Sequence, residues 1–374
     1  AAVERIPEVL NNTIYYKNVE PAEVSFRDER AILNINVEQR KANLFDGIIG
    51  LLPPRDESQA LRFTGLLDFR LVSAFHTGEI IRLHFEKLTS SSQTLNLGYT
   101  QPFLFGSNFN LSVNFELLKQ DSTFLTREFI PALSYRFSPD LSLRFEFRSR
   151  TSTLLNPDPF RERVWPPPPV LDTRSNSVSL GLEYDTRDNI RNPGRGVFVT
   201  TDVAIGTKRV DRTFGLDSLD YSRLALNQPR REFELEGRYF LPIVGPTVLM
   251  LGNHTYILSL DEFLNNDLKQ LGGAKNLRGF NENEFLASLF SIATLEYRLR
   301  MAGASYIGLF ADWAYVETQS VGSMQTNRPM SVGFTLNFQT AAGVMNVSYA
   351  IGQDDSRDFQ PSRGRVHIGL LNEF

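Results

Sequence analysis

Apolar and polar residues alternate along much of this chain. From Leu141 to Arg148 every odd-numbered residue is apolar and every even-numbered residue is polar. The same alternation runs through residues 109–116, 177–184 and 331–338. A side-chain period of two belongs to β-strands whose two faces meet different surroundings. Helical periodicity is almost absent, so the pattern predicts an all-β fold.

Turn signals divide residues 42–374 into about sixteen strands, the first over 42–52 and the last over 363–374. Every long connector between them follows an odd-numbered strand, and the short ones follow even-numbered strands. The long connectors are residues 153–174, 207–229, 261–284, 319–327 and 353–362. A transmembrane β-barrel sorts its connectors in this way, because one rim carries tight turns and the other carries longer loops. We therefore predict an antiparallel transmembrane β-barrel of about sixteen strands over residues 42–374.

Residues 1–41 have a different pattern. Val3, Ile6, Val9 and Leu10 suit one short amphipathic helix, and residues 23–37 suit a pair of strands. This segment is too short to hold a core of its own, so we expect a small periplasmic fragment before the barrel. No apolar run is long enough for a helical membrane span, and no signal peptide is expected at the start of the sequence.

Composition agrees with a barrel and excludes several other classes of protein. The chain has 29 Phe, 12 Tyr, 25 Gly and no Cys. Without cysteine there are no disulfides, no thiol catalysis and no cysteine-ligated zinc. The chain has 39 Lys and Arg against 43 Asp and Glu, a net charge of −4. It has no excess of positive charge of the kind found in nucleic-acid-binding proteins, so no nucleic acid is expected as a partner.

Histidine is too sparse to suggest an active site. The four histidines, His76, His84, His254 and His367, are far apart in the sequence and form no helix-borne metal pair. We expect no catalytic residues, no metal and no cofactor. A barrel enzyme, such as a protease or phospholipase at the rim, is the alternative, and it requires a histidine beside a carboxylate or serine at a strand end.

The connector 261–284 contains the most unusual segment of the chain. Gly272, Gly273 and Gly279 permit backbone conformations closed to other residues, and they surround Arg278. The run Leu277-Arg278-Gly279-Phe280 resembles the Val-Arg-Gly-Phe/Tyr signature of the BamA- and TamA-like outer-membrane insertase and translocator superfamily, which includes two-partner-secretion transporters. In that family the signature lies on the sixth outer loop, and the strand count places Arg278 on that connector.

Further segments resemble the same family. Residues 184–196 are similar to its turn between the eighth and ninth strands, and residues 309–314 to its Phe-x-Asp-x-Gly strand motif, with Ala314 in the last position. Residues 37–52 look like the junction from a last polypeptide-transport-associated (POTRA) domain into the barrel. The resemblance thus implies that residues 1–41 are the end of a POTRA-like domain.

The resemblance implies a location in the outer membrane of a Gram-negative-type bacterium, with the N-terminus in the periplasm. It implies insertion and assembly of outer-membrane proteins, or polypeptide translocation. The implied partners are outer-membrane lipids, client outer-membrane or secreted polypeptides, and accessory envelope subunits. Two alternatives stay open, a two-partner-secretion-type exporter that passes its client through the lumen and a passive outer-membrane pore.

The strand pleat suggests partners for Arg278. Glu296 and Asp312 share parity with the polar residues of their strands, so both carboxylates should point into the lumen. A loop folded back into the barrel would bring the planar guanidinium of Arg278 to them, as a lumen plug and not an active site. The competing interpretation is a solvated charge at the tip of an exposed loop.

The seam between the first and last strands is the second candidate. Gly47, Gly50, Gly364 and Gly369 have no side chains to support pairing there, and Phe45 lies on the first strand. A weak seam would open sideways as the lateral gate that the resemblance implies. Alternatively, these glycines only relieve crowding where strands bend. The C-terminal aromatic Phe374 resembles the terminal signal by which barrels are recognised for insertion.

Two weaker features complete the sequence. The proline tract 165–169 favours a stiff polyproline II segment on the fourth outer loop, either a rigid loop or a site for a surface partner. Two clusters of like charge fall on predicted lumen faces, where a wet interior tolerates unpaired charge; they are Arg144, Arg148 and Arg150, and Glu232, Glu234 and Glu236.

Overall fold

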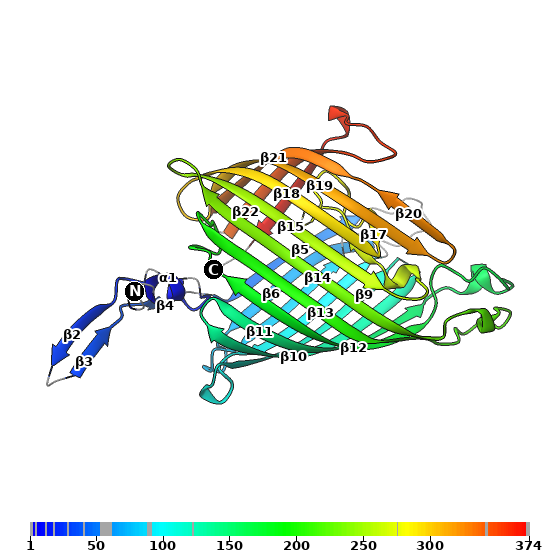
Figure 1. The fold of residues 1–374 in the computed structure, drawn as a ribbon, viewed down its shortest axis with the longest axis horizontal. Helices are drawn as coiled ribbons and strands as arrows, with labels where there is room; N and C mark the ends of the chain where they lie inside the picture. Colours follow the sequence, from blue (N-terminus) through cyan, green and yellow to red (C-terminus); the bar gives the residue numbers. More distant parts are fainter. Residues whose placement is uncertain are drawn as a thin grey trace.

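The structure is a computed structural model that describes residues 3, 6–11, 13–17, 19–27, 30–39, 42–52, 62–87, 92–121, 123–274, 276–340 and 343–371. One large antiparallel sheet closes on itself and forms a barrel, seen from the side in Figure 1. The prediction of an all-β, antiparallel barrel fold is confirmed. No helix in the described ranges is long and apolar enough to cross a membrane.

Barrel strands follow one another around the wall in sequence order. They are β5 (Leu44–Leu52), β6 (Arg62–Val72), β7 (Ile80–Lys87), β8 (Gln93–Gln101), β9 (Phe109–Gln120), β10 (Phe124–Ser138), β11 (Leu141–Leu154), β12 (Thr173–Asp185), β13 (Gly196–Val210), β14 (Asn227–Pro242), β15 (Thr247–Ser259), β18 (Leu289–Arg300), β19 (Tyr306–Ser320), β20 (Ser323–Asn327), β21 (Met330–Thr340), β22 (Gly343–Gln353) and β23 (Arg365–Leu371). In this order β23 lies beside β5, which closes the sheet.

The strands β20 and β21 occupy one position in the wall, because both pair with β19. Pro329 lies between them and has no N–H for the ladder, although its carbonyl still accepts from Ala314 N at 2.8 Å. Residues 319–327, expected as a long connector, instead extend the β19–β20 hairpin around a tight turn at Val321 and Gly322. That expectation was wrong because the alternation weakens there while the backbone pairing continues.

The two faces of the wall are the reverse of those of a soluble protein. On β12 the serines at 175, 177 and 179 are buried, whereas Val178, Leu180 and Leu182 are exposed. The same arrangement holds on β19, where Asp312 is buried between the outward-facing Leu309 and Trp313. Apolar side chains outside and polar ones inside are the arrangement that a barrel in lipid requires.

The N-terminal segment contains α1 (Ile6–Asn11), β1 (Tyr16–Lys17) paired with β4 (Glu38–Gln39), and the hairpin β2 (Glu23–Arg27) and β3 (Arg30–Asn34). Figure 1 shows this hairpin reaching away from the barrel end at which both termini lie. A short helix and a strand pair therefore occur where the pattern predicted them, and the assignment of this segment to a POTRA-like domain stays a prediction.

Long connectors gather at the opposite end of the barrel (Figure 1). Residues 155–172 and 211–226 share an apolar cluster with Leu264 of the connector after β15. In the proline tract Pro167 and Pro168 are buried, and Pro169 O accepts from Asn265 N at 2.7 Å. The tract therefore packs partly against this chain.

Candidate functional site

The β15–β18 loop, residues 260–288, folds back against the inner face of the barrel wall. Within it β16 (Lys269–Leu271) pairs with β17 (Phe285–Ala287), and residues 272–284 form a tip between them. The backbone at Gly272 has a φ of 118°, and a Cβ there would lie 2.4 Å from Asn281 O. Only glycine fits this position, so the tight tip depends on it.

Arg278 lies between two strands of the wall. Its Nη2 and Nε donate to the two carboxylate oxygens of Asp312 on β19 at 2.7 and 2.9 Å. Its Nη1 donates to Glu296 on β18 at 3.0 Å. Both carboxylates are at most 2% exposed. Separating Arg278 from these acids would leave buried carboxylates without their counter-charge, which costs more than breaking a surface ion pair.

Other residues complete this cluster and were missed from the sequence. The Arg278 guanidinium lies over the Phe310 ring, with Cζ 3.3 Å from the ring centroid. Thr294 Oγ1 donates to Asp312 at 2.9 Å, and Arg298 Nε donates to Glu296 at 2.9 Å. Because Phe310, Thr294 and Arg298 share parity with the two acids on their strands, the pleat that identified the acids also indicates these three.

The apolar neighbours of Arg278 are buried with it. Leu277 and Phe280 are fully buried in a cluster that includes Ala314, the residue in the glycine position of the strand motif. The Phe280 ring packs on Phe285 with 5.1 Å between centroids, and Arg357 Cζ lies 4.8 Å from the centroid of the Phe280 ring. The motif is therefore docked by both charge and apolar packing.

The loop tip also reaches the strands near the end of the chain. A Cβ on Gly279, where φ is 86°, would lie 3.0 Å from Gly352 N on β22 and 3.1 Å from Ser331 Cβ on β21. Gly279 N donates to His367 Nε2 on β23 at 3.2 Å. The tip thus contacts β18, β19, β21, β22 and β23. His367 was considered only as a catalytic candidate, because a single polar residue in a strand does not reveal which loop it meets.

Gly279→Ala should undock the tip. The left-handed backbone costs a side-chain-bearing residue about 1–2 kcal/mol, and overpacking against β21 and β22 adds about 1–3 kcal/mol. Gly322→Ala is the matched control, because its φ is 74° and nothing lies within 4 Å of the added Cβ. Urea titration in bilayers should give a larger loss of unfolding free energy for Gly279→Ala. Equal losses for the two would show that the close approach to β22 is unimportant.

The charged clusters predicted to face the lumen are paired with one another or with neighbours. Arg148 lies 2.9 Å from Glu146 and 3.9 Å from Glu232, and Arg150 lies 3.3 Å from Glu128. Arg144 pairs with Asp202, Glu234 with Lys269, and Glu236 with Arg238. These charges therefore have partners on the same strand, on other strands of the wall or on the β15–β18 loop.

The histidine rings bind carboxylates and one backbone amide. His84 lies 2.9 Å from Asp68 and 3.4 Å from Glu86, and His254 lies 2.8 Å from Glu234. In the described part of the chain no histidine ring is hydrogen-bonded to a serine hydroxyl, and no three acids or histidines come together as metal ligands. His84 lies within β7 and His254 within β15, not at the strand end that the barrel-enzyme alternative requires.

Four of the predicted seam residues, Phe45, Gly47, Gly50 and Gly369, lie on β5 and β23, the two strands that close the barrel. Phe45 on β5 is exposed and packs edge-on against Phe69 of β6, with 6.4 Å between centroids. Gly47 and Gly50 pair with Leu67 and Thr64 on β6, and Gly369 pairs with Asn346 on β22. Gly364 precedes β23, and a Cβ there would lie 2.1 Å from the Tyr349 hydroxyl, so relief of crowding explains this glycine. Phe374 lies outside the described residues.

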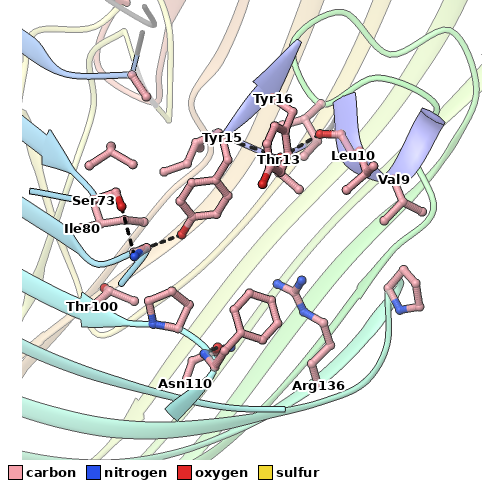
Figure 2. Close-up of a pocket in the computed structure, with 18 of the residues that line it drawn as sticks. Val9, Leu10, Thr13, Tyr15, Tyr16, Ser73, Ile80, Thr100, Asn110 and Arg136 are labelled. Atoms are coloured by element: carbon pink, nitrogen blue, oxygen red, sulfur yellow. Dashed lines mark hydrogen bonds between the residues drawn. The ribbon is translucent and has the colours of Figure 1, made fainter. Parts of the chain in front are cut away.

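A cavity of about 1560 Å³ opens at the short-turn end of the barrel, under the N-terminal segment. Figure 2 shows the Tyr15 ring reaching towards Ser73 and Ile80, with Arg136 across the pocket. The Tyr15 hydroxyl donates to Gly78 O at 2.6 Å. Burial raises the pKa of Tyr15, although Arg136 opposes this, so the hydroxyl stays a donor at neutral pH.

Several solved structures share this fold. BamA from Haemophilus ducreyi lacking POTRA domains 1–3 is 13% identical with a TM-score of 0.63, and the match covers 100% of this chain and 77% of that one. CdiB from Acinetobacter baumannii is 12% identical with a TM-score of 0.56, covering 97% of this chain and 65% of that one. CdiB from Escherichia coli is 10% identical with a TM-score of 0.59, covering 96% and 68%.

No curated protein matches the sequence. The model of the Omp85 superfamily domain matches residues 74–374, which include all of the barrel from β7 onwards and the Arg278 cluster. This agrees with the family resemblance that the Leu277–Phe280 motif indicated. The chain therefore belongs to the Omp85 superfamily of β-barrel proteins.

Proposed function

We propose that this barrel lies in the outer membrane of a Gram-negative-type bacterium, with its N-terminus in the periplasm, and assists the insertion of client outer-membrane polypeptides. The observation that carries the proposal is the Arg278 cluster: an Omp85 motif loop held by Asp312 and Glu296 on the inner wall. A loop docked there narrows the lumen, and a narrowed lumen favours a sideways route for the client.

In this mechanism the client enters at the short-turn end and pairs with a free strand edge at the seam. Paired strands satisfy their backbone groups in lipid, so a client strand that adds to β5 or β23 is inserted without exposing unpaired N–H and C=O groups. Gly47, Gly50 and Gly369 contribute no side chains to β5 and β23, which lowers the cost of separating these two strands. No covalent bond changes, and the barrel acts as a template.

A polypeptide exporter is the second candidate, favoured by the fold likeness to the two CdiB structures. In that case the client would pass through the lumen, and the β15–β18 loop would have to leave it. Both an insertase and an exporter would work with accessory envelope subunits. In both cases the cavity beside Tyr15 suits the delivery of an extended polypeptide.

A reconstitution assay tests the proposal. The protein in liposomes should accelerate the folding of a urea-unfolded client barrel, read by the heat-dependent gel mobility of the client. Liposomes with an equal amount of an unrelated barrel are the control. No acceleration above this control would exclude insertase activity. Protection of the client inside the vesicles, without its insertion, would favour the exporter.

A further inference from the structure

The first half of the β15–β18 loop is held by residues that the Arg278 motif does not include. Gln228 on β14 accepts from Asp261 N and Glu262 N at 2.7 and 2.9 Å. Arg150 on β11 donates to Asn266 O at 2.7 Å. Residues 261–267 are thus attached to the wall about a quarter turn from β18 and β19, where Arg278 binds.

Asp267 is the centre of this attachment. Its Oδ2 pairs with Lys208 Nζ of β13, and its Oδ1 lies 3.6 Å from Arg230 Nη1 of β14. The same Oδ2 accepts from Leu264 N at 2.9 Å, which caps the turn Asn265–Asp267. Lys208 is 1% exposed, and Asp267 and Arg230 are each 4% exposed. A lysine this buried requires an opposite charge. The loop supplies that charge through Asp267, and Lys208 in turn holds the loop on the wall.

The two attachments share no residue. Asp267 binds β13 and β14, whereas Arg278 binds β18 and β19. The strand β16 lies between them along the loop, and Lys269 at its start pairs with Glu234 at 2.5 Å. Breaking one ion-pair cluster therefore removes no ion pair of the other. The apolar cluster that contains Phe263, Leu268, Leu277 and Phe280 is common to both halves of the loop.

We propose that Asp267, with Lys208 and Arg230, is a second anchor of the loop that works independently of Arg278. The inference rests on the proposed function in that it treats the loop as the element that narrows the lumen. The loop is then a brace fixed at two points of the wall, and loss of Arg278 frees only the tip. Full clearance of the lumen requires both ion-pair clusters to separate.

Hydrogen–deuterium exchange of the protein in lipid nanodiscs tests this inference without any client. Arg278→Ala should lose amide protection at residues 276–284 and keep it at 261–268. Asp267→Asn should lose protection at 261–268, because the isosteric amide leaves Lys208 without its counter-charge. Lys208→Met should have the same effect, and the double variant should lose no more than either single one, since the two residues act through one pair.

Asp261→Asn is the matched control, because it removes an exposed acid from the same loop and should leave protection unchanged. If Asp267→Asn does not assemble, the comparison is made on the wall and the loop stays unaltered. Lys208→Met, which removes the charge, is then compared with Lys208→Arg, which keeps it. Uniform loss of protection over 261–284 in Arg278→Ala would overturn the second anchor, as would full protection of 261–268 in Lys208→Met. A failed insertion assay would not change either result, so the two proposals can fail separately.

Discussion

Arg278→Ala is expected to raise the single-channel conductance of the barrel. The substitution removes three hydrogen bonds and leaves Asp312 and Glu296 buried without their shared cation. Removing one partner of a buried ion pair typically costs about 3–5 kcal/mol, and the loop tip recovers part of this cost by moving so that water reaches the two acids. A tip displaced from the wall exposes more of the lumen to ions. Planar-bilayer recording of the variant beside the parent measures the effect.

Two further variants make this result specific. Arg278→Lys keeps the charge but cannot donate the bidentate pair, so its conductance should lie between those of the parent and Arg278→Ala. Arg161→Ala removes an arginine whose pair with Asp158 is solvated, and it should behave as the parent. A parental conductance in Arg278→Ala would mean that the tip does not narrow the pore. That result would favour a passive channel whose width is set by the barrel wall alone.

The strand period made most of the wall predictable from the sequence. Because side chains on a strand alternate between lumen and lipid, the parity of Glu296 and Asp312 alone placed both acids inside, and both are buried there. The sequence around Arg278 has no periodic pattern, because this residue lies in a loop. Its meeting with the two acids followed only from the family motif and from the requirement that a buried charge find a partner.

The second anchor had no comparable signal. Lys208 and Asp267 are 59 positions apart, and an isolated lysine and aspartate look like any solvated pair of charges. The separation of β17 from β18 was likewise hidden, because residues 285–290 form an apolar run interrupted only by the buried Ser288, without a turn signal. Contacts between an aperiodic loop and distant strands depend on the closed shape of the barrel, which no local pattern contains.

The loop links the proposed function to the seam. Through Gly279 and His367 the tip is bonded to β23, so the last strand is held from inside the barrel. Phe45 and the first strand pack instead on β6. If clients enter at this closure, β5 and β23 have to separate during each cycle, and a covalent link between them should stop activity completely.

The absence of cysteine makes this link simple to build. Phe45→Cys is combined with Leu370→Cys, or with a cysteine at whichever of residues 368–371 forms the disulfide most completely. Client folding is then measured in liposomes before and after reduction of the disulfide. Leu251→Cys with Leu295→Cys, directly paired on β15 and β18, supplies a bridged control away from the closure. We expect the oxidised seam variant to fall to the rate of protein-free liposomes and to recover on reduction, while the control stays active throughout. Full activity with β5 and β23 joined would contradict the account.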